Sequence, residues 1–270
     1  MASKLSKTKG QHKQEELHTK SEEFEKRISE TKRKGGDDAR SIVKDLRAQK
    51  DAYYDRQHKQ LVQKDNTLFV AFYILLNLAE DLNVERKMVK KNLIESLITM
   101  LSRSQENVIC ISVSFLRKLS IMEENKDEMK ARGIVERLAS LIPCPSQKVV
   151  IDVLRLLFNL SFDQGVRLEI LQIGLLPKLL DLLKTPAYRG RTLKVLYHLS
   201  AEERCRSMFT YSDAIPLLMG LVINFPTEKL PPELGGLMTQ LSVAPKNAEL
   251  MIGNRGLNHL VDRLEGTHDV

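Results

Sequence analysis

The sequence predicts an all-α protein, a right-handed superhelical solenoid of about five three-helix repeats. Three observations predict it. A short phrase that ends in leucine and a small residue recurs five times, a longer apolar phrase recurs in the same register, and both follow one period of about 41 residues. Periods of this length are typical of helical solenoids, in which each unit buries its apolar face against its neighbours. The repeats are therefore expected to fold as one continuous domain.

The first phrase sets the register of the repeats. It reads LLNLA at 75–79, LRKLS at 116–120, LFNLS at 157–161, LYHLS at 196–200 and LMTQLS at 237–242. The last leucine of each phrase is followed by that of the next at 41, 41, 39 and 42 residues. We call these the register leucines and expect all five to be buried at equivalent positions: Leu78, Leu119, Leu160, Leu199 and Leu241.

The third repeat indicates how each unit divides into three helices. Apolar residues recur every three or four positions over about 147–161, which predicts a long helix with one buried face. A shorter segment follows and ends at Gly174, a residue suited to the left-handed turn beyond a helix. Pro177 fits the first turn of a third helix. Three helices in about 41 residues are typical of the armadillo repeat. In the fifth repeat, two prolines and two glycines between 231 and 236 should shorten the long helix.

The long helix of each repeat is expected to line the concave wall of the solenoid. On its side away from the stacking face, positions i, i+3 and i+7 lie close to one line. These lines begin at Val70, Ile111, Asp152, Arg191 and Glu233. From them we select a ladder of candidate partner-binding residues: Tyr73, Asn77, Ser114, Lys118, Arg155, Asn159, Arg191, Lys194, His198 and Gln240.

The ladder carries two kinds of side chain that suit a peptide ligand. Four cations, at 118, 155, 191 and 194, favour an acidic or phosphorylated segment. The amides at 77, 159 and 240 can donate and accept at once, as binding to a peptide backbone requires. The alternative is that these residues are ordinary solvated surface, and that Asn77 and Asn159 bond only to neighbouring backbone.

We divide the chain into a charged extension at 1–65, helical or disordered, a repeat domain at 66–264 and a tail at 265–270. The extension holds 17 of the 42 Lys and Arg and 12 of the 35 Asp and Glu, so most of the net charge of +7 lies there. Leu17, Phe24 and Ile28 predict a weak amphipathic helix, and the glycines at 35 and 36 a break after it. We expect 1–35 to be mobile. A stronger apolar stripe between Ala39 and Leu61 predicts a helix over 38–64 that touches and caps the first repeat.

Composition and motifs argue against catalytic, metal-binding and membrane functions. The chain has no GxSxG, GxxxxGK or GxGxxG motif, and its six histidines never take metal-ligand spacing. No cofactor, metal or small-molecule substrate is expected. The three cysteines lack CxxC spacing, which indicates a reducing, cytoplasmic environment. The most apolar stretch, at 67–79, is too short to cross a membrane.

Nucleic-acid binding through the basic extension remains an alternative. It is disfavoured because the two signs of charge are mixed there, and because the chain has no tryptophan and few other aromatic residues on which bases could stack.

Five segments carry a more specific resemblance. They are NTLFVAFYILLNLAED at 66–81, SFLRKLSIMEENKDEM at 114–129, LRLLFNLSFDQGVR at 154–167, IGLLPKLLDLL at 173–183 and VLYHLSAEERCRSMFTYSDAIPLLM at 195–219. They resemble the central portion of the kinesin-associated protein family, the armadillo-repeat, non-motor subunit of heterotrimeric kinesin. The match is specific because it includes segments between helices, such as FDQGVR, which packing alone does not dictate.

The resemblance implies an adaptor rather than an enzyme. Such a protein binds the tail regions of the two kinesin motor subunits and links them to cargo proteins on microtubules, notably in intraflagellar transport in cilia and flagella. The alternative is another armadillo scaffold, such as a signalling adaptor or a nuclear import receptor. Import receptors of this fold carry a tryptophan four residues before the groove asparagine, and this chain has none at those positions.

Overall fold

The computed structural model describes residues 9–225, 230–253 and 255–265, and within these ranges the chain forms helices and no strand. The side chain of Leu17 and the tail beyond residue 265 lie outside the description. In chain order the helices are α1 (Lys9–Lys34), α2 (Asp37–Leu78), α3 (Leu82–Val89), α4 (Leu93–Met100), α5 (Glu106–Leu119), α6 (Glu123–Ala131), α7 (Ile134–Ser140), α8 (Gln147–Leu160), α9 (Gln164–Gln172), α10 (Leu176–Leu182), α11 (Pro186–Leu199), α12 (Glu203–Thr210), α13 (Ala214–Ile223), α14 (Pro232–Ser242), α15 (Pro245–Ile252) and α16 (Gly256–Glu265). The chain divides into two units, Met1–Thr67 and Leu68–Val270.

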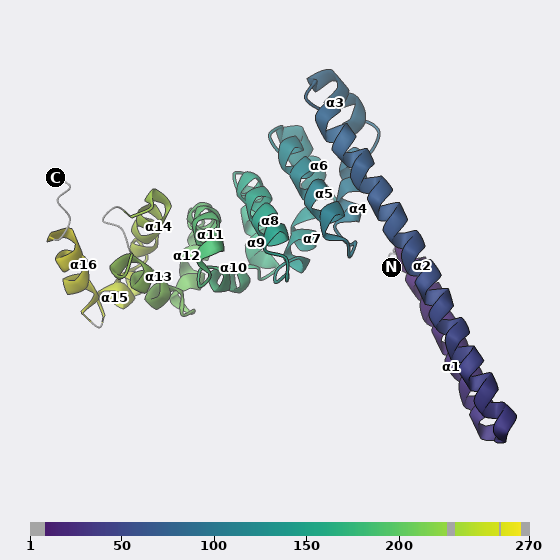
Figure 1. The fold of residues 1–270 in the computed structure, drawn as a ribbon. Helices are drawn as coiled ribbons and strands as arrows, with labels where there is room; N and C mark the ends of the chain where they lie inside the picture. Colours follow the sequence, from purple (N-terminus) through teal and green to yellow (C-terminus); the bar gives the residue numbers. More distant parts are fainter. Residues whose placement is uncertain (1–8, 226–229, 254, 266–270) are drawn as a thin grey trace, which may run out of the picture. The chain divides into compact units, whose positions relative to one another are not determined.

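The first unit is a pair of long helices, with α1 lying alongside the first part of α2 (Figure 1). The glycines at 35 and 36 have φ of +65° and +96°, a left-handed conformation that glycine adopts without strain, and they separate the two helices. Ile28 of α1 is buried against Val43 and Leu46 of α2. The Phe24 and Tyr53 rings lie 6.2 Å apart. Part of each predicted apolar stripe therefore forms the contact between α1 and α2.

The second unit is a helical solenoid in which two short helices alternate with one long helix (Figure 1). The long helices α5, α8 and α11 have 14 residues each, and α14 has 11, as the prolines and glycines of the fifth repeat predict. Consecutive long helices contact each other. One hydrophobic core runs without interruption from Phe72 to Met251. The predicted all-α solenoid is confirmed.

Four of the five register leucines are fully buried, and the prediction for the first of them, Leu78, is wrong. Leu119, Leu160, Leu199 and Leu241 have no exposed surface, whereas Leu78 is 52% exposed. In a middle repeat this leucine is enclosed by helices of its own repeat and of the preceding one. Among the described residues of the second unit, no earlier repeat stands before α2, so the side of Leu78 that would face it is open.

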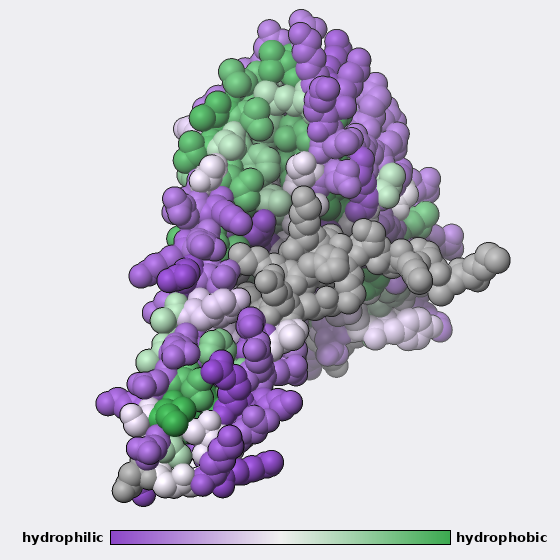
Figure 2. All heavy atoms as spheres, turned by 90° about the vertical axis from the view of Figure 1, so that its right-hand side faces the viewer, coloured by the Kyte–Doolittle hydropathy of each residue, from purple (hydrophilic) through white to green (hydrophobic). Residues whose placement is uncertain are grey.

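Leu78 belongs to an exposed apolar stripe. It continues with Val70, Tyr73 and Ile74 on α2 and with Leu82 at the start of α3, each more than half exposed. Figure 2 shows the corresponding hydrophobic patch at the upper end of the molecule.

Local signals explain where several helices of the solenoid begin and end. Gly174 has φ of +73° between α9 and α10, and Pro177 lies in the first turn of α10, as expected. At α8 and α9, the side chains of Ser146 and Asp163 accept from backbone N–H groups of the first turn. Gly236 in α14 permits a close approach, because a Cβ there would lie 2.7 Å from the Tyr197 ring of α11.

Two glutamates face each other between consecutive repeats, Glu136 on α7 and Glu169 on α9. Burial, the charge of Glu136 and a hydrogen bond with it raise the pKa of Glu169 from its ordinary 4.5 to about 7, although nearby Lys130 opposes the rise. The folded state therefore holds its proton more tightly than the unfolded state does. The free energy of unfolding should fall as the pH rises from about 4.5 to about 7.

We expect Glu169→Gln to stabilise the protein at pH 8 by about 1 kcal/mol, a discounted value because the site is partly solvated. Well below pH 4.5, where the Glu169 carboxyl group is protonated in both the folded and the unfolded state, it should have little effect. Urea unfolding at the two pH values measures the difference. Glu124→Gln on α6, an exposed glutamate, is the matched control and should change stability equally at both. A stabilisation by Glu169→Gln that does not depend on pH would contradict the proposed repulsion.

Candidate protein-binding surface

The structure places the predicted ladder on the accessible side of the long helices. Tyr73, Asn77, Arg155 and Lys194 are exposed, and Ser114, Lys118, Asn159, Arg191, His198 and Gln240 are half-buried. Two starting positions of the predicted lines are not accessible, since Ile111 and Asp152 are each only 8% exposed. The first position lies about 60° round the helix from the second, at 100° per residue, which turns it toward the packed side. The accessible wall therefore consists mainly of the i+3 and i+7 positions.

Three of the four ladder cations have an acidic neighbour. Lys118 lies 3.4 Å from Glu80, Arg155 lies 3.1 Å from Asp152, and Lys194 lies 3.6 Å from Glu233. Two of these contacts, those of Lys118 and Lys194, connect different repeats. The cations are held in place by these contacts, and the wall is less positive than the ladder residues alone suggest.

The last ladder position of α8, α11 and α14 bonds to a serine of the preceding repeat. Asn159 Nδ2 donates to Ser120 Oγ at 3.1 Å, and also to the Arg117 carbonyl at 3.3 Å. His198 Nδ1 lies 2.7 Å from Ser161 Oγ, and Gln240 bonds to Ser200. We call these three contacts the serine relay. The amide N–H of Asn159 thus bonds to groups of the protein itself. This agrees in part with the alternative that Asn159 bonds to neighbouring backbone.

The serines of the relay also bond backward within their own helices. Each hydroxyl lies 2.7 Å from the carbonyl three residues earlier, that of Arg117, Phe158 or Tyr197. Because the Ser161 hydroxyl donates to the Phe158 carbonyl, it accepts from Nδ1–H of His198. Burial, and then the charge of Arg167, lower the pKa of His198, so its ring is neutral at pH 7. The other ring nitrogen, Nε2, is left as an acceptor.

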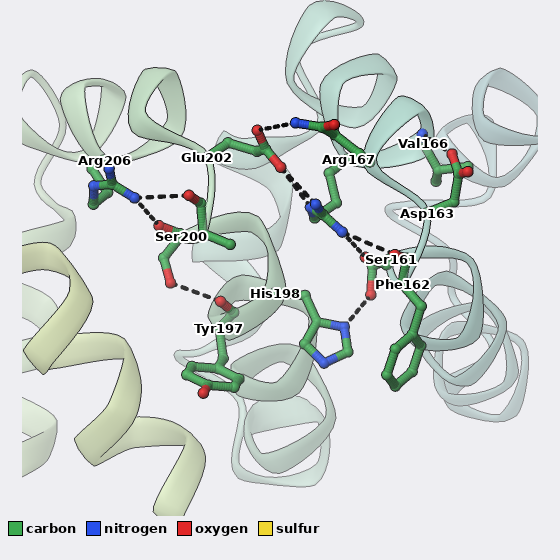
Figure 3. Close-up of polar contacts among 12 residues, drawn as sticks. Ser161, Phe162, Asp163, Val166, Arg167, Tyr197, His198, Ser200, Glu202 and Arg206 are labelled. Atoms are coloured by element: carbon green, nitrogen blue, oxygen red, sulfur yellow. Dashed lines mark hydrogen bonds and ion pairs between the residues drawn. The ribbon is translucent and has the colours of Figure 1, made fainter.

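Two arginines complete the ends of α8 and α11 (Figure 3). Arg167 donates to the carbonyls of Ser161 and Phe162, each at 3.0 Å, and its guanidinium lies 2.7 Å from the Glu202 carboxylate of the next repeat. Arg206 donates in the same way to the carbonyls of residues 200 and 201, each at 2.8 Å. Each arginine lies seven positions after a register leucine. Neither arginine was predicted as a site residue, although this spacing could have identified them.

Three rings form a compact cluster between α8 and α11, which we call the aromatic triad: Phe158, Phe162 and His198. Their centroids lie 4.5 to 5.3 Å apart. Phe162 is 61% exposed. The Lys126 ammonium lies 6.0 Å from the centroid of Phe162, and that of Lys194 lies 5.8 Å from the centroid of Phe158. Only His198 and Lys194 of this group were predicted as site residues.

Two of the three cysteines carry thiols with a raised pKa. Burial raises the pKa of the Cys110 thiol to about 11 and that of Cys205 to about 12, so both are protonated at pH 7. Within the described ranges, no group of three His, Cys, Asp or Glu residues could hold a metal ion. No described helix is both long enough and apolar enough to span a membrane. The surface offers binding groups, namely amides, cations and rings.

Comparison with known proteins gives both a family and a fold. The model of the kinesin-associated protein (KAP) family matches residues 1–269. A computationally designed armadillo repeat protein for modular peptide recognition superposes with a TM-score of 0.64 at 16% identity, over 75% of this chain and 90% of its own. A designed armadillo repeat protein in complex with the peptide (KR)4 superposes with a TM-score of 0.58 at 15% identity, over 84% and 94%.

A more distant match in sequence carries little information. A probable inactive serine/threonine-protein kinase of Dictyostelium discoideum is 24% identical over 121 residues, which are 44% of this chain and 6% of that protein. The chain thus spans only a small part of that relative's length.

Proposed function

The chain belongs to the kinesin-associated protein family, and from that premise we propose that it is a non-catalytic adaptor that binds the tails of the motor subunits of heterotrimeric kinesin. It links these motors to cargo proteins in microtubule-based transport, in the cytoplasm and in cilia or flagella. The observation that carries the proposal is the family match over residues 1–269, nearly the whole chain.

We assign the ladder to an acidic segment of the motor tails. The exposed guanidinium of Arg155 and ammonium of Lys194 support this assignment, because both lie on the accessible wall and are held there by neighbouring carboxylates. A partner carboxylate would displace or share these contacts. The designed relative named for its complex with (KR)4 takes a basic peptide. Cations on the ladder favour the opposite sign of charge, and they also disfavour the basic signals of a nuclear import receptor.

Reversing the four ladder cations together tests the assignment. Exposed charge contacts are worth about 0.2 to 1 kcal/mol each, so single changes would be difficult to detect. We expect the quadruple change of Lys118, Arg155, Arg191 and Lys194 to Glu to weaken binding of motor tails by about tenfold or more at low salt. The loss should shrink at moderate salt because ions screen exposed charges. Isothermal titration calorimetry measures the affinity, and circular dichroism confirms the fold.

A second quadruple variant controls for net charge. It reverses four exposed cations outside the long helices: Lys87, Lys90, Lys91 and Arg204. Equal weakening by both variants would mean that overall charge, rather than the ladder, attracts the tails. Unchanged affinity of the ladder variant at both salt concentrations would place the motor site elsewhere. If the unaltered chain binds no motor tail, the adaptor proposal fails for this chain.

A further inference from the structure

We propose that the aromatic triad, together with Lys126 and Lys194, is a binding site for an acidic protein segment that presents one aromatic side chain, best a tryptophan. The site rests on the proposed function only for the identity of the protein that carries the segment. Its chemistry follows from the three rings and the two ammonium groups. Of these five residues, only Lys194 is among the four cations changed in the charge-reversal test.

The exposure of Phe162 is the first argument. This ring contacts both other rings of the triad, yet 61% of it faces solvent. Other repeats carry Ile121, Ala201 and Val243 two positions after the register leucine, all exposed, so stacking of the repeats does not require a phenylalanine here. Covering a large, already ordered apolar surface is how an aromatic anchor gains affinity, since little conformational freedom is lost.

The charges around the rings select the sign of the partner. The two ammonium groups lie beside different rings of the triad, that of Lys126 at Phe162 and that of Lys194 at Phe158. Lys194 also lies 3.6 Å from Glu233, a contact long enough for its ammonium to reach a partner carboxylate as well. Two carboxylates near the rings are already engaged within the protein. That of Asp163, which follows Phe162 directly, lies 3.4 Å from the Lys130 ammonium, and that of Glu202 pairs with Arg167. Acidic side chains flanking an aromatic anchor would therefore meet cations, and basic ones would be repelled.

His198 favours tryptophan among aromatic anchors. Its Nδ1 is held by Ser161, so the ring is fixed against Phe158 with Nε2 pointing away from the serine (Figure 3). Nε2 accepts a hydrogen bond in the neutral ring. An indole has one N–H donor on a large apolar ring, which matches an acceptor beside two phenylalanines.

The absence of tryptophan from this chain makes the site easy to probe, because the fluorescence of a peptide tryptophan is then unambiguous. The probe is a short peptide of glutamates around one tryptophan. One comparison peptide replaces the glutamates with lysines, and the other replaces the tryptophan with alanine. Because the alanine peptide has no tryptophan fluorescence, its affinity is measured by competition with the acidic tryptophan peptide. We expect the acidic tryptophan peptide to bind with a blue shift of its emission, and both comparison peptides to bind at least tenfold more weakly.

Variants place the binding at the triad. Phe162→Ala should weaken the acidic peptide at least tenfold, and Lys126→Glu several-fold. Ile121→Ala is the matched control, since Ile121 is the equivalent, 73% exposed residue of the preceding repeat, and it should bind as the unaltered chain does. Thermal unfolding monitored by circular dichroism confirms that each variant folds.

Three results would overturn the proposal: no binding of the acidic peptide by the folded chain, equal affinities of the Phe162→Ala and Ile121→Ala variants, or equal binding of the lysine peptide. Failure here leaves motor binding through the ladder intact, because that is measured with motor tails and different substitutions. Conversely, a positive result without motor binding would retain the site and remove its assignment to kinesin.

Discussion

Leu160→Ala is expected to lower the free energy of unfolding by about 2 to 5 kcal/mol. The side chain of Leu160 is fully buried at the end of α8, within the core that joins successive repeats. Truncation removes buried methyl groups and leaves a cavity that the packed helices on either side cannot fill completely. Equilibrium unfolding in urea, followed by circular dichroism, measures the loss.

The matched control is Leu78→Ala, the same position of the repeat in α2. Leu78 is 52% exposed, so its truncation should cost less than about 1 kcal/mol. The dependence on urea must be compared as well, because a repeat array can lose cooperativity and unfold in parts. Equal losses at the two leucines would contradict the environments that the structure gives them.

The two leucines illustrate what a repeat period can and cannot predict. Equal spacing predicts equal position within a repeat, and this held for the helices, the turn at Gly174 and four register leucines. Burial, however, depends on the neighbouring repeats as well. Leu78 has no described repeat before it, and the period alone does not predict whether a neighbouring repeat is present to cover a residue.

The candidate site shows the same division. Helical periodicity placed Arg155 and Asn159 on the accessible wall, because angular position around a helix follows directly from residue number. It did not identify their partners. Asn159 bonds to Ser120 across 39 residues, and Lys118 reaches Glu80 across 38, contacts that exist only once the repeats are stacked. The small residue that ends each phrase was visible in the sequence, and its role as a hydrogen-bonding partner was not.

The aromatic triad was the feature least accessible to sequence analysis. Phe162 follows the end of α8 and is therefore outside the helical period that selects the ladder. Its ring meets His198 only because α8 and α11 pack side by side. A large aromatic residue in a polar turn was the available signal, and a single such residue is common on protein surfaces.

Arg167 joins two consecutive repeats through a largely buried ion pair. Its guanidinium and the Glu202 carboxylate are 16% and 12% exposed, and the same guanidinium satisfies two carbonyls at the end of α8. Burial alone would raise the pKa of Glu202, but the hydrogen bonds from Arg167 and Gln164 outweigh it and lower the pKa. The folded pKa thus lies below the unfolded value of 4.5. This stabilisation is present above about pH 4.5 and is lost as the pH falls through the folded pKa.

We therefore expect Arg167→Ala to cost about 2 to 4 kcal/mol at pH 7, because it leaves a largely buried carboxylate and two carbonyls without their donor. Arg206→Ala is the matched control. It removes the same pair of carbonyl contacts one repeat later. Arg206 acts on Glu202 only through a weaker effect of its charge, so the change should cost only about 1 to 2 kcal/mol. Urea unfolding at pH 7 and below pH 4 measures both variants. The excess cost of Arg167→Ala over Arg206→Ala should shrink in acid, because Glu202 takes up a proton there. An excess that stays constant with pH would mean that the carbonyl contacts, rather than the ion pair, hold the two repeats together.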